Sequence, residues 1–358
     1  MLSEERRERI LQEVAIRGRV HVMEFAARTG LSGMTIRRDL AVLAARGLVR
    51  RVHGGAVLPG AADAPIAGDS GFSSSRRPIG TVGFIVPDSN YYFPPVIRGA
   101  HAAARQLGLR LVLGVTNYDP GEEVRQLVKL SENGADGILL VTARPGVDDA
   151  RTWDCLASVR PPVVLVERSA REAPLALGVD SVRSDHSSGT ELAVDHLVAG
   201  GHRRIGLICR DSATASWIEE GYVRASSRWG LSHDSPRMRA PSLRWSAETA
   251  PDILRDFLDA CLASDTRAAI VLPDDLAIGL LSVVEEAGLK VPEDFAIVSY
   301  DDEMASLASV PLTAVAPPKD AVGRQAMQTC FMRLGERNAC PALRIELAPE
   351  LHARESSP

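Results

Sequence analysis

The sequence predicts an α/β protein with two lobes built on parallel sheets, preceded by a small winged helix-turn-helix domain. Three observations lead to this prediction. Residues 1–58, the head, hold amphipathic helical patterns, a capped turn and a basic strand, in that order. Residues 79–352, the body, alternate short apolar runs with helical patterns, as parallel sheets covered by helices do. Residues 59–78 are rich in proline, glycine and serine without periodicity, and predict a flexible linker.

The head is expected to hold three helices, of which the third would touch DNA. Ser32 is a favourable N-cap for this helix. Ile36, Leu40 and Leu43 follow at helical spacing and are expected to face inward. Three residues near the start of the helix then face outward, namely Thr35, Arg37 and Arg38. Such residues can contact base edges and phosphates in the major groove. The alternative is that these arginines only cover a solvated helix face.

A basic strand over residues 48–53 leads into the glycine pair Gly54–Gly55. This pattern predicts a β-hairpin wing beside the third helix. The wing would lay Arg51 and His53 on the DNA backbone or into the minor groove.

Two segments of the head resemble the signature of the DeoR family of bacterial repressors. They are Thr35-Ile36-Arg37-Arg38-Asp39-Leu40 and Arg51-Val52-His53-Gly54-Gly55-Ala56, and the resemblance covers residues 1–58. It implies that the head binds double-stranded operator DNA. The charges agree, because the first 60 residues carry eleven arginines against six acidic residues, whereas the remainder carries 30 basic and 40 acidic residues. A basic head on an acidic body suits phosphate contact by the head alone.

The body contains two successive series of strands and helices. The expected strands cover residues 81–86, 109–114, 137–141, 162–166, 204–208, 268–272 and 295–300. The expected helices cover residues 96–108, 122–133, 188–199, 250–263 and 276–287. Two series indicate two lobes, and ligands of open α/β sheets sit beyond the carboxyl ends of the strands.

Polar and aromatic residues gather in the loops after these strands, at residues 88–93, 167–168, 212–217, 274–275 and 301–302. Carboxylates accept hydrogen bonds from hydroxyls, and an aromatic ring can cover the apolar face of a sugar, so the loops predict a sugar site. The alternative for each acid is that it caps the helix that follows. The alternative for Tyr91 and Tyr92 is packing at the surface of a lobe.

Several motifs of the body resemble the regulatory core of the LacI/GalR repressors. They include Val179-Asp180-Ser181-Val182, Gly201-His202-Arg203-Arg204-Ile205, Pro273-Asp274-Asp275-Leu276 and Tyr300-Asp301-Asp302, and the resemblance covers roughly residues 79–350. It implies a periplasmic-binding-protein-like fold with a ligand in the cleft between two lobes. Lobe 1 is then expected to comprise residues 79–181 and 303–330, and lobe 2 residues 182–302 and 331–352.

The resemblance also implies which residues hold a small sugar effector. Its positions fall on Tyr92, Phe93, Glu167, Trp245, Asp274 and Asp301, and Asp88 and Ser216 lie in the same loops. One departure is informative, because Ser216 stands where the family usually carries an arginine that grips sugar hydroxyls. An acid-rich cleft without that arginine favours a neutral sugar or glycoside over acidic ligands. The family's hinge helix behind the DNA-binding head is also missing.

Together these patterns predict a repressor of transcription that is controlled by a sugar effector. A homodimer is expected, because one winged head reads too few base pairs for specificity. A sugar-processing enzyme is disfavoured, since the catalytic motifs HExxH and GxSxG and the Gly-rich phosphate loops are missing. A sugar-binding transport protein would need an export signal, whereas the N-terminus is charged. We expect no catalytic residues, no metal, no cofactor, no membrane partner and a cytoplasmic location.

Overall fold

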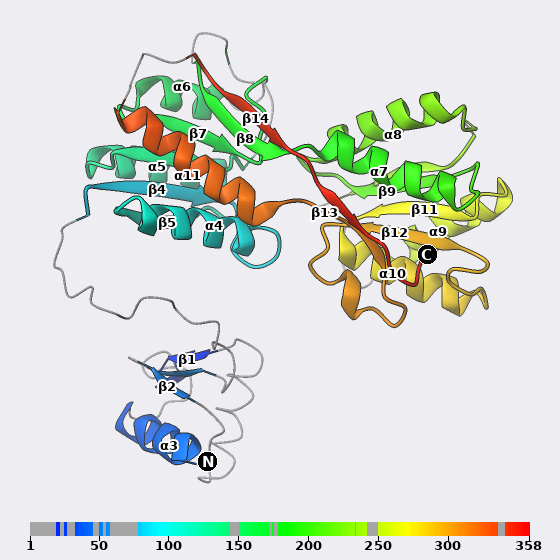
Figure 1. The fold of residues 1–358 in the computed structure, drawn as a ribbon, viewed down its shortest axis with the longest axis horizontal. Coiled ribbons are helices and arrows are strands. Elements are labelled where there is room, and N and C mark those ends of the chain that lie inside the picture. Colours follow the sequence, from blue (N-terminus) through cyan, green and yellow to red (C-terminus); the bar gives the residue numbers. More distant parts are fainter. Residues whose placement is uncertain are drawn as a thin grey trace. The chain divides into compact units, whose positions relative to one another are not determined.

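The structure is a computed structural model that divides the chain into two compact units, Met1–Arg77 and Pro78–Pro358. The first unit contains the head and the second the body, and each is described by itself (Figure 1). The residues that the structure describes are 19–21, 25–26, 33–45, 50–52, 55–57, 78–143, 150–171, 174, 178–232, 234–241, 250–335 and 341–358.

The head combines a helix with a small antiparallel sheet. Its elements are β1 (Arg19–His21), α3 (Gly33–Ala45), β2 (Arg50–Val52) and β3 (Gly55–Val57), with the strand order β1-β3-β2. The third helix predicted from the sequence and its inward face are confirmed, because Ile36, Leu40 and Leu43 are at most 2% exposed. Strand β1 was not expected from the sequence. It is three residues long, too short for a recognisable alternation.

Lobe 1 of the body is a six-stranded parallel sheet with two helices on each face (Figure 1). Its strands are β4 (Gly80–Val86), β5 (Leu109–Val115), β6 (Gly137–Leu140), β7 (Val163–Val166), β8 (Asp180–Ser184) and β14 (Arg344–Leu347), in the order β14-β8-β7-β6-β4-β5. Helices α4 (Phe93–Gln106) and α11 (Lys319–Gly335) cover one face, and α5 (Pro120–Glu132) and α6 (Ala150–Ser158) cover the other.

Lobe 2 has the same layers and strand order, but its last strand runs antiparallel to its neighbour. Its strands are β9 (Gly206–Arg210), β10 (Arg237–Ala240), β11 (Ala268–Leu272), β12 (Ala296–Tyr300), β13 (Thr313–Ala316) and β15 (Glu350–His352), in the order β10-β9-β11-β12-β13-β15. Helices α7 (His186–Ala199) and α8 (Ala215–Trp229) cover one face, and α9 (Ala250–Ala263) and α10 (Asp274–Glu286) cover the other. In both lobes the first two strands stand in reversed order, which makes a doubly wound sheet with a switch point for ligand binding.

The chain passes between the lobes three times, from β8 to α7, from β13 to α11 and from β14 to β15. These passages correct the lobe boundaries expected from the resemblance. Strand β13 was placed in lobe 1 but pairs with β12 and β15 in lobe 2. Strand β14 and the end of α11 were placed in lobe 2 but belong to lobe 1, where β14 pairs with β8. Strands of three or four residues carry too little sequence signal to be assigned to a sheet.

Helices α4 and α11 pack closely because glycines stand where they cross. A Cβ atom on Gly323 would lie 1.9 Å from the carbonyl oxygen of Val96, and one on Gly99 would lie 1.9 Å from that of Asp320. The close crossing brings the N-terminal ends of the two helices together, at Phe93 and Lys319. It thereby fixes two loops that border the cleft between the lobes.

Candidate functional site

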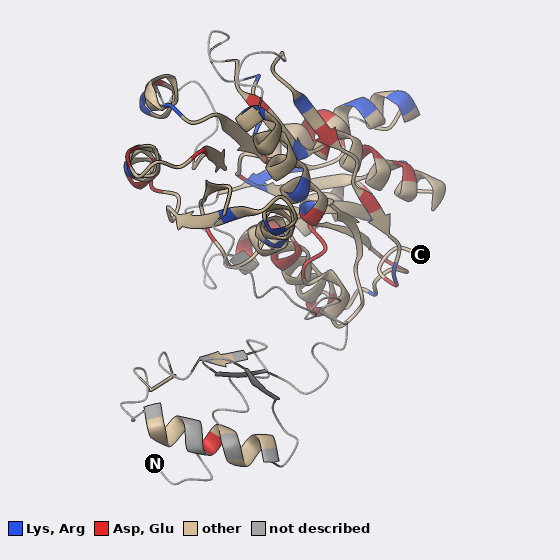
Figure 2. Cartoon of the chain, turned by 60° about the vertical axis from the view of Figure 1, so that its left-hand side comes forward, with Lys and Arg blue, Asp and Glu red and all other residues tan. Residues whose placement is uncertain are grey.

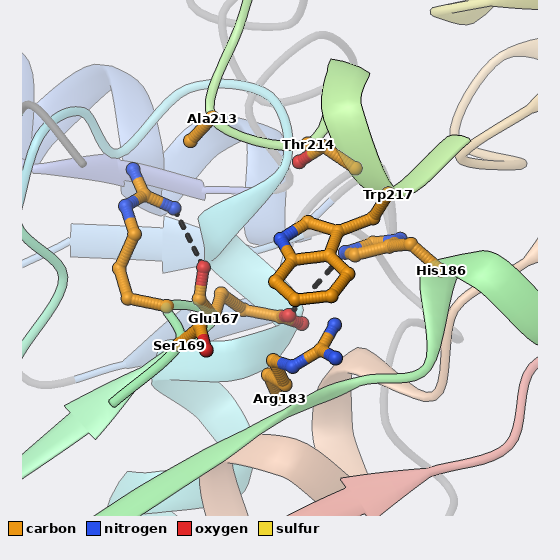
Figure 3. A pocket seen from close by; sticks show the side chains of 8 residues that line it. Glu167, Ser169, Arg183, His186, Ala213, Thr214 and Trp217 are labelled. Carbon is orange, nitrogen blue, oxygen red and sulfur yellow. Dashed lines mark hydrogen bonds and ion pairs between the residues drawn. The ribbon is translucent and has the colours of Figure 1, made fainter. Parts of the chain in front are cut away.

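A polar cavity lies between the two lobes, at the carboxyl ends of the strands (Figure 3). Lobe 1 contributes the turn after β7 and strand β8, and lobe 2 contributes the start of α7 and the turn from β9 into α8. The lining residues are Glu167, Arg168, Ser169, Arg183, His186, Ala213, Thr214 and Trp217. The cavity measures about 10 Å³, roughly the space of one water molecule. A sugar therefore requires the lobes or the lining side chains to move apart.

Glu167 is the most heavily bonded acid of this cavity. Its carboxylate accepts hydrogen bonds from the Tyr92 hydroxyl at 2.8 Å and from the Ser184 amide and hydroxyl at 3.0 and 2.9 Å. His186 of lobe 2 lies 3.6 Å away. Burial acts to raise the pKa of Glu167, but His186, Ser184 and Tyr92 together lower it to about 2. Glu167 is thus a fixed anion that ties lobe 1 to lobe 2, with little capacity left for a ligand.

Two arginines line the cavity beside Glu167, and the sequence analysis did not single out either. Arg168 is 9% exposed and donates to the carbonyl oxygens of Thr142 and Glu167 at 2.9 and 2.7 Å. Arg183 is 4% exposed, and its guanidinium carbon lies 4.0 Å from the centre of the Trp217 ring (Figure 3). The expectation of a neutral effector rested on Ser216, which replaces one arginine of the family. Two other positions of the cavity carry arginine, which that expectation did not consider.

Asp274 is a structural residue in this cleft. Its side chain is fully buried, and its carboxylate accepts hydrogen bonds from the Ser299 hydroxyl at 2.5 Å and from the amides of Glu303 and Met304 at 2.6 and 2.8 Å. These three donors saturate most of its acceptor positions. Asp274 therefore shapes the loop after β12. This role differs from the capping of the following helix that the sequence analysis considered for each loop acid.

Asp301 differs from Asp274 in that its carboxylate is buried but accepts no hydrogen bond from any residue that the structure describes. Its backbone carbonyl accepts a hydrogen bond from Lys319 Nζ, which also donates to Glu303 at 2.6 Å. Burial raises the pKa of Asp301 to about 7, against the opposing effect of Lys319. A buried carboxyl group without a partner is costly, so Asp301 is the predicted site residue with the most capacity for a ligand.

The other predicted effector residues lie at different distances from the cavity. Tyr92 points its hydroxyl at Glu167, whereas Phe93 packs in the core of lobe 1. Asp88 accepts hydrogen bonds from the Tyr118 hydroxyl at 2.8 Å and from the Asn90 amide. Ser216 is exposed on the first turn of α8, and its neighbour Trp217 lines the cavity instead. Trp245 lies outside the described residues.

Further contacts bridge the lobes around the cavity. The Tyr91 hydroxyl of lobe 1 accepts a hydrogen bond from the Asp274 amide of lobe 2 at 3.3 Å. Lys319 Nζ of lobe 1 lies 5.2 Å from the centre of the Tyr92 ring of the same lobe, within the range of a cation–π interaction. It also donates to Glu303 of lobe 2 at 2.6 Å. The Tyr91–Asp274 and Lys319–Glu303 contacts would change when the lobes move, so they report on the state of the cleft.

Of the predicted DNA-binding residues, Thr35 is half-buried on α3. The backbones of Arg37, Arg38 and Arg51 are described in α3 and β2, whereas Ser32 and His53 lie outside the described residues. Within the described ranges, no group of three or more His, Cys, Asp and Glu residues could hold a metal ion. No helix there is long and apolar enough to cross a membrane.

Sequence reasoning missed Arg183 and His186 because it did not recognise strand β8. That strand is fully buried yet reads Asp-Ser-Val-Arg-Ser, without an apolar run or a regular alternation. The position of Arg183 and His186 around the carboxyl end of a strand was the available signal. Trp217 lay within a loop that the sequence did indicate.

Comparison with known proteins identifies both parts of the chain. Residues 194–357 match the family model of the periplasmic binding protein-like domain, and residues 6–61 match that of the DeoR-like helix-turn-helix domain. The two parts of the chain thus resemble a DeoR-like helix-turn-helix domain and a periplasmic binding protein-like domain. The two resemblances seen in the sequence are therefore confirmed.

Individual relatives agree with this assignment. The arabinose metabolism transcriptional repressor of Geobacillus stearothermophilus is 29% identical over 93% of this chain and 90% of its own length. The ribose operon repressor of Escherichia coli strain K12 is 28% identical over 77% of this chain and 82% of its own length. A LacI family regulator from Enterococcus faecium, solved with bound ribose, shares the fold of the body. It has a TM-score of 0.64 and 24% identity over 77% of this chain and 98% of that one. All three of these relatives are described as regulators or repressors.

Proposed function

We propose that the chain is a repressor of transcription whose affinity for operator DNA is set by a small sugar-type effector bound between the two lobes. One observation carries the proposal, namely that a helix-turn-helix head and a two-lobed body with a polar inter-lobe cavity occur in one chain. Relatives described as sugar-operon repressors, and a related regulator solved with ribose, support the sugar class.

Asp301 is the main residue that would bind the effector. Its buried carboxylate lacks a protein hydrogen bond among the described residues, so sugar hydroxyls can donate to it. The Tyr92 ring lies beside Lys319 and Glu167 and offers an apolar face. Asp274 holds the Asp301 loop in shape without touching the effector. Binding of the effector replaces contacts such as Tyr91–Asp274, and the lobes then turn relative to each other.

A homodimer places two heads on an inverted-repeat operator. One surface of the body suits a second copy of the chain. Strand β5 is the unpaired edge of the lobe 1 sheet, and it exposes Val112 and Leu113 by 37% and 43%. Exposed apolar edge strands favour pairing with another chain. Sedimentation of the full chain at micromolar concentration should give the dimer mass, and a Val112→Glu variant should sediment as the monomer.

Operator binding is tested with the full chain and DNA sequences enriched by it from a random pool. Arg37→Ala and Arg38→Ala should each weaken binding of the enriched sequence by about 1–3 kcal/mol, if they contact bases. Arg125→Ala, an exposed residue of α5 in the body, is the matched control and should bind normally. Normal binding by both head variants, or failure to enrich any sequence, would overturn the proposal.

A further inference from the structure

A buried lysine of lobe 1 reaches into lobe 2 beside the cleft. The chain has three lysines, of which Lys129 and Lys290 are exposed, whereas Lys319 is 6% exposed. Lys319 is the first residue of α11, where the positive end of the helix dipole disfavours a cation. A buried charge in such a place is costly unless other groups pair with it. Contacts outside α11 therefore have to offset this cost.

The turn after β12 in lobe 2 provides these contacts. Lys319 Nζ donates to the backbone carbonyl oxygen of Asp301 and, at 2.6 Å, to the carboxylate of Glu303. The Glu303 side chain is 25% exposed, so the ion pair is largely withdrawn from water. Buried ion pairs are sensitive to the loss of either partner, because the other charge is then left unpaired. Lys319 thus ties lobe 1 to one particular turn of lobe 2.

The same turn carries the acid that we propose to bind the effector. Asp301 has a φ angle of 98°, which a residue other than glycine rarely adopts, so surrounding contacts have to hold the turn. From within lobe 2, the Asp274 carboxylate accepts hydrogen bonds from the amides of Glu303 and Met304. From lobe 1, Lys319 binds the Asp301 carbonyl oxygen and Glu303. The position of the Asp301 carboxylate therefore depends on contacts from both lobes.

Lys319 is itself anchored within lobe 1. The glycine crossing of α4 and α11 fixes the helix that begins with this lysine. Its Nζ lies 5.2 Å from the centre of the Tyr92 ring, whose hydroxyl donates to Glu167. Glu167 in turn lies 3.6 Å from His186 of lobe 2. The contacts of Lys319 are thus linked to a second contact between the lobes.

We propose that Lys319 is a positioning residue, which holds the turn Asp301–Glu303 of lobe 2 on lobe 1 and keeps the cleft closed. Lys319 does not bind the effector in this role, but acts through the position of Asp301. The inference rests on the proposed function in taking Asp301 as an effector residue, and deepens it by naming a residue that regulates this site. Without the ammonium group the lobes separate more readily, and the turn loses one of its two supports.

Hydrogen exchange of the full chain, followed by mass spectrometry without effector or DNA, tests this inference. Asp274 is the first residue of α10, so its amide has no acceptor within the helix. It donates instead to the Tyr91 hydroxyl of lobe 1, so its exchange reports on closure of the cleft. Residues 301–304 report on the turn, and residues 268–272 of β11 report on the stability of the lobe 2 sheet.

Substitution of either partner of the ion pair should open the cleft. In Lys319→Met, the amides of Asp274 and of residues 301–304 should exchange about tenfold or more faster, because Glu303 loses its partner. Glu303→Gln should change exchange in the same direction. The double variant should exchange no faster than the faster single variant, since both substitutions remove one interaction. Lys319→Arg keeps the positive charge and the donors, and should recover part of the protection lost in Lys319→Met.

Lys129→Met is the matched control, because it makes the same change at an exposed lysine of α5 in lobe 1. Its exchange should equal that of the wild type in every reporter segment. Circular dichroism checks that the variants are folded, and Glu303→Gln keeps the test decisive if Lys319→Met unfolds.

Three results would overturn the inference: unchanged exchange in both single variants, additive acceleration in the double variant, or acceleration that is equally large in β11. The last result would show that Lys319 only adds to the stability of the fold. None of these measurements uses effector or DNA. Sugar titration and operator binding with the same preparation therefore separate a failure of this inference from a failure of the proposed function.

Discussion

Two carboxylates at the cleft have opposite properties because their local partners differ. Glu167 is surrounded by donors and has a pKa lowered to about 2, whereas burial raises the pKa of Asp301 to about 7. The sequence places both acids in loops after strands. It could not tell which of them would receive its hydrogen bonds from the protein itself. Asp274 illustrates the limit, since its three hydrogen bonds come from Ser299 and from backbone amides of a distant loop. Ser216 and Trp217 are neighbours in the chain, yet the first is exposed and the second lines the cavity.

The raised pKa of Asp301 predicts a specific dependence of stability on pH. Between pH 4 and 7 the unfolded chain has lost this proton while the folded chain keeps it, so Asp301 destabilises the fold progressively as pH rises. The unfolding free energy of Asp301→Asn should therefore equal that of the wild type near pH 4. Near pH 8 it should be higher than that of the wild type, by on the order of 4 kcal/mol. Urea unfolding at both pH values measures this, with the exposed Asp234→Asn as control. An equal stability difference at the two pH values would contradict the assignment.

At the scale of elements, strands and helices with strong apolar periodicity are predicted well from the sequence. Helix α9 and strand β11 have the expected bounds, and α4 and α10 begin within three residues of the expected starts. Elements that were not expected, such as β8, β13 and β14, are short or polar. The position of each of these strands in its sheet depends on pairing with strands far away in the chain. Local periodicity in the sequence carries no information about such pairing.

The glycines at the α4–α11 crossing give a prediction for the packing of elements. Gly323→Ala would force a Cβ atom to within 1.9 Å of the Val96 carbonyl oxygen, so the helices must separate. We expect a loss of about 1–3 kcal/mol in unfolding free energy, as for other overpacked positions. Gly335→Ala is the matched control at the end of the same helix, since its Cβ would meet nothing within 4 Å. Equal stability of the two variants in thermal unfolding would show that the crossing is not close.

At the scale of the molecule, two lobes with the same strand order are joined by three passages, and the cavity lies where the lobes meet. Acidic and basic residues are interspersed over the helices and strands of the body (Figure 2). The body still carries more acidic than basic residues, whereas the head is basic. An effector changes DNA affinity only if it binds two arrangements of the body with different affinity.

Transmission of the effector signal from the body to the head through residues 59–78 can be tested by changing the length of this linker. These residues lie almost entirely outside the described part of the chain, and their composition is that of a flexible tether. If the spacing of the heads carries the signal through docking on the body, several Gly-Ser residues inserted near Ser74 should leave effector affinity unchanged and weaken the response of DNA binding. A full response after a long insertion would exclude spacing as the signal.

The most direct measurement is the affinity of the full chain for its enriched DNA sequence, followed by fluorescence anisotropy. It is made with and without a saturating ligand, found by titrating the chain with neutral sugars, sugar acids and sugar phosphates. The account predicts that the ligand changes the dissociation constant for DNA by about fivefold or more, as coupling free energies of 1–3 kcal/mol produce. It predicts no such change in Asp301→Ala, which loses the ligand. A ligand that binds the body tightly and leaves DNA affinity unchanged would contradict the account.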